Sequence, residues 1–397
     1  MKIAYFTSKF PYEQSNSKYI CGGSVFATES LVNEISKMGH DIKVFTTSMD
    51  SNTTYETRKN IKIYRYGTNL NIMSSNISLD LFIKPKKYDV DIVHVSFDMP
   101  PGPLAGLRYA KNKDLPLIIT YHGDWDPSYG NIMRKIGVKL NNNLIVKDLL
   151  SYADLIISPS NLYIDKSQYL SKYNEKIRVI PNGIDLKEFD IKYSKKKARN
   201  TLNLPLDKKI ILFFGYLSPY KSPDILLRAF QHVLKREENV ILLFAGTGDM
   251  EKNLKTLAME LGMNNNVIFV GFVEKNKRAL YYKSADIFCL PSTKSTECYP
   301  LAILEAVASK TPVIASDIGG ISEIIKKDFT GMLIQPNNQK DLVNAILNLL
   351  KDSELRDKLS KNAYDHVKKY SWKNIANETN KLYLELGENN ENLSRMC

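Results

Sequence analysis

The sequence predicts an α/β protein with two doubly wound, Rossmann-like domains. Three observations support this fold class. At 397 residues the chain is longer than a single hydrophobic core usually allows. Short apolar runs alternate with amphipathic helical patterns, and this alternation pauses at residues 191–200 before it resumes. Strands that alternate with helices are typical of a parallel sheet covered on both faces.

The first domain is expected over residues 1–190. Its amphipathic helices are predicted at Phe26–Met38 and Leu162–Leu170. Its strands are predicted from short apolar runs, which are Ile3–Thr7, Ile42–Thr46, Ile92–Ser96, Leu117–Tyr121, Leu155–Ser158 and Val179–Pro181.

Residues 191–200 are expected to form a solvated linker or an exposed helix start, because they hold four Lys and one Arg without an acid. The second domain follows over residues 201–371. Its strands are predicted at Ile210–Gly215, Val240–Ala245, Val267–Val270, Ile287–Leu290, Val313–Ala315 and Met332–Ile334. Its helices are predicted at Asp224–Lys235, Met250–Leu261, Leu301–Ser309, Lys340–Leu350 and Glu354–Lys369. A last helix is expected over residues 372–387, and a polar, frayed tail over 388–397.

The composition limits the classes of partner. A net charge of +12 favours acidic partners, such as nucleotide phosphates or an anionic membrane surface. Nucleic acid fits this charge too, but the sequence has no zinc-finger, basic-zipper or RNA-binding aromatic motif, so we expect no nucleic-acid partner. The four cysteines lack metal-ligand spacing, and the N-terminus enters a strand without a signal-like apolar core. We therefore expect a cytoplasmic protein without a membrane span.

Several enzyme classes are disfavoured by motifs that the sequence lacks. The turn at residues 8–11 has no Gly-x-Gly-x-x-Gly, and Gly246-Thr247-Gly248 lacks the third glycine, which disfavours a dinucleotide-dependent oxidoreductase. The P-loop Gly-x-x-x-x-Gly-Lys-Ser/Thr and the Gly-x-Ser-x-Gly elbow are also missing. Asp124-Trp125-Asp126 has the form of a metal-chelating pair, and a metal role there is the minor alternative.

The most informative segment is Glu297–Glu305, in which two glutamates lie eight positions apart around an apolar stretch. Pro300 predicts a helix start, because proline has no N–H to lose in the first turn. The free N–H groups at a helix start favour anions. We therefore expect a ligand phosphate there, with Glu305 directed at hydroxyls and Glu297 beside the ligand. The alternative is a solvated glutamate next to an ordinary core helix.

This segment resembles the Glu-x7-Glu element of retaining glycosyltransferases of family 4, which have the GT-B fold. Other elements occur in the family's order over nearly the whole chain, namely Gly22-Gly23, His122, Pro181–Asp185, Gly215 with Lys221, Ala245–Gly248, Gly271–Val273, Pro312–Ser316 and Gly319-Gly320. The resemblance implies that the two domains face a cleft that holds the active site. It also implies that helix 372–387 crosses back to the first domain.

The activity that the resemblance implies is retaining transfer of a sugar from a nucleotide-diphosphate sugar, such as a UDP- or GDP-sugar, to a hydroxyl acceptor. The acceptor would be a glycan, a glycolipid or a lipid-linked precursor. The resemblance implies a hexosyltransferase-like enzyme that needs neither a metal nor another cofactor. Front-face attack without a protein nucleophile is implied, while double displacement through a carboxylate stays open.

The resemblance also implies the residues of the site. Catalytic roles fall to Glu297, to His122 at the transferred sugar and to Lys221 at the leaving diphosphate. In the donor site Glu305 would bind the ribose. The full donor-binding set is Gly22, Gly23, Gly215, Tyr216, Lys221, Gly246, Phe272, Val273, Glu297, Cys298, Tyr299, Pro300, Leu301 and Glu305.

Two departures from the family pattern keep alternatives open. An arginine is common where this chain has Tyr216 or Ser218, and a glycine is usual where it has Lys310. A lysine cannot replace the bidentate contact of a guanidinium. The main alternative is therefore a non-catalytic sugar-nucleotide-binding protein of the same fold. A third hypothesis, after the glycosyltransferase and the binding protein, is another enzyme of that fold, such as a phosphorylase with pyridoxal phosphate or a nucleotide-sugar epimerase.

Peripheral contact with the inner face of an anionic membrane is a further expectation. Basic residues cluster at Lys84–Lys87 and at Arg134, Lys135 and Lys139. The second cluster lies in 131–146, where six residues supply apolar surface: Ile132, Ile136, Val138, Leu140, Leu144 and Ile145. The alternative is that these apolar residues pack into the core, and that Asn141–Asn143 interrupts the helix.

Overall fold

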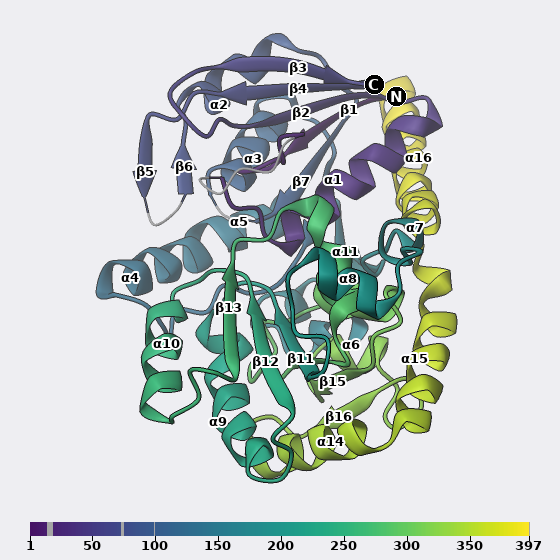
Figure 1. The fold of residues 1–397 in the computed structure, drawn as a ribbon. Helices are drawn as coiled ribbons and strands as arrows, with labels where there is room; N and C mark the ends of the chain where they lie inside the picture. The colour runs from purple at the N-terminus through teal and green to yellow at the C-terminus, as the bar shows by residue number, and fades with distance from the viewer. Residues whose placement is uncertain (14–18, 73–74, 99, 397) are drawn as a thin grey trace. The chain divides into compact units, whose positions relative to one another are not determined.

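The computed structural model describes residues 1–13, 19–72, 75–98 and 100–396 (Figure 1). The chain forms two compact units. Unit 1 contains Met1–Gly183 together with Trp372–Cys397, and unit 2 contains Ile184–Ser371. The first segment of unit 1 therefore ends at Gly183, earlier than the predicted boundary at residue 190.

Unit 1 is built on one large sheet with the strand order β10-β9-β8-β7-β1-β2-β4-β3, in which only β3 is antiparallel to its neighbour. A separate antiparallel pair is formed by β5 and β6. The strands are β1 Lys2–Phe6, β2 Asp41–Thr47, β3 Thr54–Arg58, β4 Ile61–Tyr66, β5 Leu70–Ile72, β6 Ser75–Ile77, β7 Ile92–Phe97, β8 Leu117–Tyr121, β9 Leu155–Ser158 and β10 Ile177–Val179. The helices are α1 Gly23–Ile35, α2 Asp80–Ile83, α3 Gly102–Lys113, α4 Ile132–Leu140, α5 Lys147–Tyr152, α6 Asn161–Ile164 and α16 Trp372–Met396.

Unit 2 is built on a six-stranded parallel sheet with the order β13-β12-β11-β14-β15-β16. The strands are β11 Lys209–Phe214, β12 Val240–Ala245, β13 Val267–Gly271, β14 Ile287–Leu290, β15 Val313–Ser316 and β16 Met332–Ile334. The helices are α7 Leu186–Phe189, α8 Lys195–Thr201, α9 Pro223–Leu234, α10 Glu251–Glu260, α11 Arg278–Ser284, α12 Leu301–Ala308, α13 Ile321–Ile324, α14 Gln339–Lys351 and α15 Ser353–Val367.

Each sheet has a point at which the strand order reverses. In unit 1 the first strand, β1, pairs with β2 on one side and with β7 on the other. In unit 2 β11 pairs with β12 on one side and with β14 on the other. In open α/β sheets ligands bind beyond the carboxyl ends of the strands at such a point. The segments that follow β1, β7, β11 and β14 are therefore the first places to look for functional side chains.

The C-terminal helix α16 is part of the core of unit 1. Its buried side chains, Ile375, Ala376, Leu382 and Tyr383, join one apolar cluster with residues of β1, β2 and α1. The Tyr383 hydroxyl also contacts the Tyr5 hydroxyl at 2.6 Å and His94 Nδ1 at 2.5 Å. The predicted last helix therefore exists, but it continues to Met396 instead of ending at residue 387.

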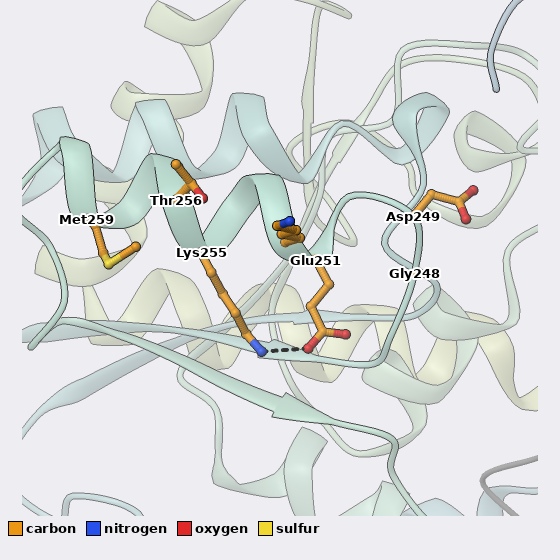
Figure 2. Close-up of a pocket in the computed structure, with 7 residues that line it drawn as sticks. Gly248, Asp249, Glu251, Lys255, Thr256 and Met259 are labelled. Carbon is orange, nitrogen blue, oxygen red and sulfur yellow. Dashed lines mark hydrogen bonds and ion pairs between the residues drawn. The ribbon is translucent and has the colours of Figure 1, made fainter. Parts of the chain in front are cut away.

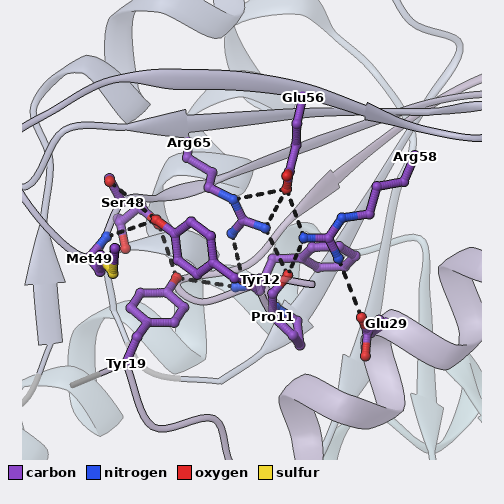
Figure 3. A network of polar contacts seen from close by, with 11 residues as sticks. Pro11, Tyr12, Tyr19, Glu29, Ser48, Met49, Glu56, Arg58 and Arg65 are labelled. Atoms are coloured by element: carbon purple, nitrogen blue, oxygen red, sulfur yellow. Dashed lines mark hydrogen bonds and ion pairs between the residues drawn. The ribbon is translucent and has the colours of Figure 1, made fainter. Parts of the chain in front are cut away.

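A buried arginine fixes the loop that follows β1 (Figure 3). Arg65 of β4 is fully buried and donates hydrogen bonds to the carbonyls of Phe10 at 2.5 Å and Pro11 at 2.8 Å. Its charge is balanced by Glu56 at 2.6 Å. Arg58 donates to the same Pro11 carbonyl and pairs with Glu29 of α1 at 3.5 Å. These contacts tie the loop to both the sheet edge and α1.

Several predicted elements differ from the structure. The strand predicted at Val179–Pro181 lies at Ile177–Val179. Of the two alternatives for residues 191–200, the helix start is confirmed from Lys195, where α8 begins with Ser194 as its cap. Arg199 of this helix is buried against Asp286, with 2.6 Å between Nη2 and Oδ2. The helix predicted at Leu162–Leu170 ends at Ile164. Beyond it, the Asp124 carboxylate accepts hydrogen bonds from Ser167 Oγ and Gln168 N and so holds the chain in another path.

Candidate active site

Three loops meet at the carboxyl edge of the unit 2 sheet. Gly215 N donates to Ala245 O at 2.9 Å, and Gly246 N donates to Gly271 O at 2.9 Å. Gly215 and Gly246 have backbone φ values of +140° and +135°, which residues with a Cβ rarely adopt. A Cβ on Gly246 would also lie 2.0 Å from Gly215 O. Glycine is thus needed for the close approach that brings the predicted donor residues Gly215, Gly246 and Phe272 onto neighbouring loops.

A buried ion pair lies where the strand order of unit 2 reverses. Lys221 ends the short turn Pro219–Lys221 after β11, and Glu297 lies in the loop after β14. Lys221 Nζ is 2.5 Å from Glu297 Oε2, and both residues are buried. The two segments are held together because Thr293 N donates to Tyr220 O at 2.9 Å. Two of the predicted catalytic residues are therefore in direct contact.

The Lys221 ammonium is kept charged by its partner. Burial alone would lower the pKa of Lys221, but the adjacent carboxylate of Glu297 more than compensates, so that the pKa is raised above its usual value. The lysine stem also passes over the glycine turn, since a Cβ on Gly215 would lie 4.0 Å from Lys221 Cδ and Cε. The arrangement places a permanent positive charge beside the backbone of the predicted diphosphate loop.

Helix α12 begins as the proline predicts. Pro300 is the cap residue, with φ −71° and ψ 118°, and the first helical residue is Leu301. The first N–H groups of a helix have no carbonyl partner within it, and they carry the positive end of the helix dipole. Cys298, Tyr299 and Pro300, all predicted to bind the donor, form the turn that leads into this helix start. This end of α12 is therefore suited to an anion.

Glu305, in the second turn of α12, is not a solvated glutamate. It is buried, and each of its carboxylate oxygens accepts a hydrogen bond. Arg278 donates to Oε1 through Nη2, and the Tyr282 hydroxyl donates to Oε2 at 2.8 Å. Arg278 and Tyr282 lie one turn apart on α11. Neither residue was predicted from the sequence, although their spacing of four positions places them on one face of a helix.

One of the two loop positions at which the resembled family commonly has arginine, Tyr216 or Ser218, holds a tyrosine that faces an acid. Tyr216 is partly exposed, and its hydroxyl donates to Asp249 Oδ1 at 2.9 Å. Asp249 lines a shallow hollow along α10 (Figure 2), whose other lining residues are Gly248, Glu251, Lys252, Lys255, Thr256 and Met259. None of the predicted donor residues lines this hollow, so we do not assign the donor site to it.

The predicted site residues of unit 1 lie at the carboxyl edge of its sheet. His122 follows β8, and its Nε2 is 3.2 Å from Ser96 Oγ on β7. Ser96 in turn accepts a hydrogen bond from Thr28 of α1 at 2.7 Å. Gly22 is the cap of that helix and Gly23 its first residue. A Cβ on Gly22 would meet no described atom within 4 Å, so the space beside it is open.

The imidazole of His122 is neutral near pH 7. Burial lowers the pKa of His122 to about 4. A neutral ring that accepts or donates at Ser96 has a second nitrogen available for a hydroxyl group. Ser96 and Thr28 were not predicted. Their contact with His122 depends on residues that lie far apart in the sequence.

Other candidate residues are structural. His94 contacts Tyr383 and Thr120, and burial lowers the pKa of His94 to about 3. Asp124 accepts from the Tyr121 hydroxyl at 2.7 Å. In the part of the chain that the structure describes, no three His, Cys, Asp or Glu side chains are grouped so that they could hold a metal ion. No described helix combines the length and apolarity needed to cross a bilayer.

Comparisons with known proteins agree with these features. The family model of glycosyl transferases group 1 matches residues 194–366, and that of glycosyltransferase family 4 matches residues 21–188. An uncharacterized glycosyltransferase of Methanocaldococcus jannaschii is 31% identical, over 96% of this chain and 98% of its own length. The alpha-monoglucosyldiacylglycerol synthase of Streptococcus pneumoniae is 32% identical, over 88% of this chain and 78% of its own length.

A solved structure shares the fold. Sucrose-phosphate synthase from Thermosynechococcus elongatus matches with a TM-score of 0.76 and 23% identity, over 97% of this chain and 98% of that chain. The predicted fold class is confirmed, with mainly parallel α/β sheets in two units. From its sequence and its fold, the chain belongs to glycosyltransferase family 4 and has the GT-B fold.

Proposed function

We propose that the protein is a retaining glycosyltransferase that moves a sugar from a nucleotide-diphosphate sugar to a hydroxyl acceptor. The observation that carries the proposal is the buried contact between Lys221 and Glu297 at the point of strand reversal in unit 2. Burying two charges costs free energy that their mutual attraction often fails to repay, and ionisable groups that are both buried and paired cluster at functional sites. Here the pair lies in the loops that, in this architecture, meet the ligand.

The proposed reaction uses fixed positive charge to help the nucleoside diphosphate leave. The bond between the sugar C1 and the phosphate oxygen breaks, and the acceptor hydroxyl forms a new bond to C1 on the same face. The acceptor proton passes to the leaving phosphate. Lys221 and the N–H groups at the start of α12 stabilise the negative charge that develops. We propose that a metal is not required, because these groups supply the positive charge.

The remaining roles follow the chemistry of each group. Neutral His122 hydrogen-bonds a hydroxyl of the transferred sugar, and Glu305 accepts the hydroxyls of the donor ribose. Gly22 and Gly23 allow the backbone at the start of α1 to approach the ligand. Phe272 and Val273 line the base. The hexosyl identity of the sugar and a cytoplasmic location are parts of the same proposal.

A donor panel tests the function directly. The purified full chain is incubated with UDP-, GDP- and ADP-linked hexoses, a panel of glycan and diacylglycerol-type acceptors, and no added metal. We expect acceptor-dependent release of one nucleoside diphosphate and an α-linked product from an α-linked donor, seen by NMR. A product of inverted configuration would overturn the retaining mechanism, and a strict need for added divalent metal would overturn metal independence.

The alternative is a protein that binds the donor without transfer. Tyr216, which faces Asp249 where an arginine is common, favours it, because one cation for the diphosphate is missing. Calorimetry separates the two functions when it is combined with turnover. Tight donor binding without transfer to any acceptor would support the binding protein. A phosphorylase of the same fold is tested by the absorbance of a lysine-bound pyridoxal phosphate.

The acceptor side of the proposal includes contact with an anionic membrane. In α4 and the π-helical segment Asn141–Val146 that continues it, Ile132, Met133, Ile136, Leu140 and Leu144 are each more than half exposed. The alternative that these residues fill the core is therefore wrong for them, and it holds for Val138, which is buried. The asparagine run does interrupt the α-helical pattern, because α4 ends at Leu140 and the chain continues as a π-helix over Asn141–Val146. Within this segment buried Asn142 donates to Trp125 O at 2.8 Å.

The positive charges beside the exposed apolar residues of α4 and Asn141–Val146 favour an anionic lipid surface as the partner of these residues. Ile132, Ile136, Leu140 and Leu144 recur every four residues and so form a stripe along the helix. Lys139 and Lys147 are also exposed, whereas Arg134 is engaged by the carbonyls of Asp126 and Tyr129. Apolar residues beside lysines suit an interface with anionic lipid. The name of the diacylglycerol-glucosylating relative supports a lipid acceptor for this chain as well.

Liposome flotation tests this surface. We expect binding to phosphatidylglycerol vesicles at low salt, little binding to phosphatidylcholine vesicles, and release at high salt. Ile136→Asp with Leu140→Asp should abolish binding, and Lys139→Glu should weaken it about fivefold or more, since each lysine near the surface contributes roughly 1 kcal/mol. Leu162→Asp with Leu206→Asp, two exposed leucines elsewhere, is the matched control and should bind as the wild type does. Equal binding by the α4 variant would exclude this face.

A further inference from the structure

We propose that Arg278 and Tyr282 are positioning residues that hold the Glu305 carboxylate in the orientation needed to read the ribose hydroxyls of the donor. The proposal rests on the function proposed above, and it assigns roles to two residues that the sequence motifs do not include. Neither residue is proposed to touch the donor. Both act through Glu305.

The Glu305 carboxylate is held from two directions. Its Oε1 accepts from the Arg278 guanidinium, and its Oε2 accepts from the Tyr282 hydroxyl at 2.8 Å. A carboxylate has about four lone-pair positions, so two remain for other donors. A carboxylate that is fixed at both oxygens cannot rotate freely. Its remaining acceptor positions therefore point in set directions, as recognition of a pair of neighbouring hydroxyls requires.

Arg278 and Tyr282 are themselves fixed by the residues that pack against them. Arg278 is buried, and its guanidinium lies 5.8 Å from the ring centre of Phe189 and 5.9 Å from that of Phe214. The Tyr282 ring packs 4.9 Å from Phe214. An arginine beside aromatic faces loses little further freedom when it binds a carboxylate. Arg278 and Tyr282 therefore hold the Glu305 carboxylate in its orientation before any ligand binds.

Glu305, Arg278 and Tyr282 also lie in a suitable part of unit 2. Arg278 begins α11, the helix that follows β13 and the predicted base-lining segment Phe272-Val273. Glu305 lies one turn beyond the anion-suited start of α12. A nucleoside diphosphate has its ribose between its base and its phosphates. Glu305 lies on the helix whose start would hold the phosphates, and Arg278 and Tyr282 lie on the helix that follows the base-lining loop. A carboxylate shared by these two helices is suitably placed for the ribose.

A second buried arginine–carboxylate pair in unit 2 supplies the matched control. Arg199 and Asp286 are as buried as Arg278 and Glu305, but Asp286 directly precedes β14 and therefore lies at the amino edge of the sheet. Ligands of such sheets bind at the other edge. A change to either pair is expected to affect stability. Only a change around Glu305 is expected to affect recognition of the ribose.

The test measures discrimination against a ribose that lacks its hydroxyls. Calorimetry is carried out with UDP, GDP and ADP and with their 2′,3′-dideoxy counterparts on the full chain. For the diphosphate that binds, the wild type should prefer the ribose form by about tenfold or more, because a hydrogen bond to a charged group is lost in the dideoxy form. Arg278→Lys and Tyr282→Phe should each reduce this preference several-fold, by weakening the ribose form and leaving the dideoxy form nearly unchanged.

The outcomes separate this inference from the proposed function. Arg199→Lys should keep the full preference for ribose even if it unfolds more easily. An unchanged preference in both Arg278→Lys and Tyr282→Phe, with the wild type clearly discriminating, would overturn the positioning roles alone. If none of the three diphosphates binds the wild type, the donor-binding function is overturned. Tyr282→Phe removes only one hydroxyl, so a folded variant is available even if Arg278→Lys fails to fold.

Discussion

Replacing Lys221 with alanine is expected to lower the rate of sugar transfer by about 10²- to 10³-fold, as the loss of one preorganised donor to a developing anion does in other enzymes. The variant loses the ammonium that lies 2.5 Å from Glu297 and leaves this carboxylate buried without its partner. Both changes act on the proposed leaving group, because they remove positive charge and add uncompensated negative charge where the diphosphate departs. Initial rates of nucleotide release, with the donor at saturation, measure the effect.

The control for Lys221→Ala is Lys195→Ala. Lys195 also pairs with a buried acid, Asp286, at 2.6 Å, but it is half exposed and lies at the amino edge of the sheet. Its removal should leave the rate of transfer near that of the wild type. Circular dichroism establishes that both variants are folded. A folded Lys221→Ala protein that transfers sugar at the wild-type rate would remove Lys221 from the mechanism.

Replacing Asp286 with alanine is expected to destabilise the protein by about 3–5 kcal/mol, the cost of removing one partner from a buried ion pair. Asp286 accepts from Arg199 Nη2 at 2.6 Å, from Lys195 Nζ at 2.6 Å and from Ile210 N at 2.8 Å. Without it, the buried Arg199 guanidinium keeps its carbonyl acceptors but loses its carboxylate partner, and the Ile210 N–H loses its acceptor. Urea unfolding followed by far-UV circular dichroism measures the change in midpoint, because both tryptophans lie in unit 1 and would not report on unit 2.

The same residue predicts a pH dependence. Burial alone would raise the pKa of Asp286, but Lys195, the Ile210 N–H and Arg199 outweigh it, so the pKa is lowered. A carboxyl group whose pKa is lowered by folding stabilises the protein above its unfolded pKa, about 3.9, and loses this contribution as the pH falls further. The difference between wild type and Asp286→Ala should therefore be constant at neutral pH and shrink below about pH 4.

An exposed pair serves as the control for Asp286. Glu274 and Lys277 form an ion pair at 3.0 Å in which both side chains are about half exposed. Such pairs contribute little because water screens them. Glu274→Ala should leave the unfolding midpoint unchanged. If the urea midpoint of Asp286→Ala also stayed at that of the wild type, the buried pair would not stabilise unit 2.

The parts of the fold that the sequence predicts well are those buried on both faces. The runs Leu117–Tyr121 and Val240–Ala245 coincide with β8 and β12, because a central parallel strand is made almost entirely of apolar residues, Thr120 being the polar one in β8, and the run ends where the strand does. Strand β3 was missed. It is an edge strand whose residues are largely exposed, so Thr54–Arg58 shows no apolar run.

Part of the candidate site could also be predicted from local sequence. Pro300 marks the start of α12, and Glu297 and Glu305 lie on either side of it. The donor-binding roles of Gly215 and Gly246 came from the resemblance to the family and stay predictions. Arg278, Ser96 and Thr28 could not be predicted, since their roles come from contacts between elements that are distant in the chain. The stripe of α4 is a third case. Apolar residues at helical spacing look the same whether protein or solvent covers them, and only the structure shows that Ile136 and Leu140 are exposed.

The place of α16 has a consequence for how the protein is made. Unit 1 takes its core from both ends of the chain, whereas unit 2 is one continuous segment, Ile184–Ser371. Domains fold as units during synthesis, usually the N-terminal one first. Here the order is reversed, because Ile3, Tyr5 and His94 must wait for Tyr383 to leave the ribosome before the first-made core can close. The nascent chain thus carries an open apolar surface until α16 has been synthesised and covers it.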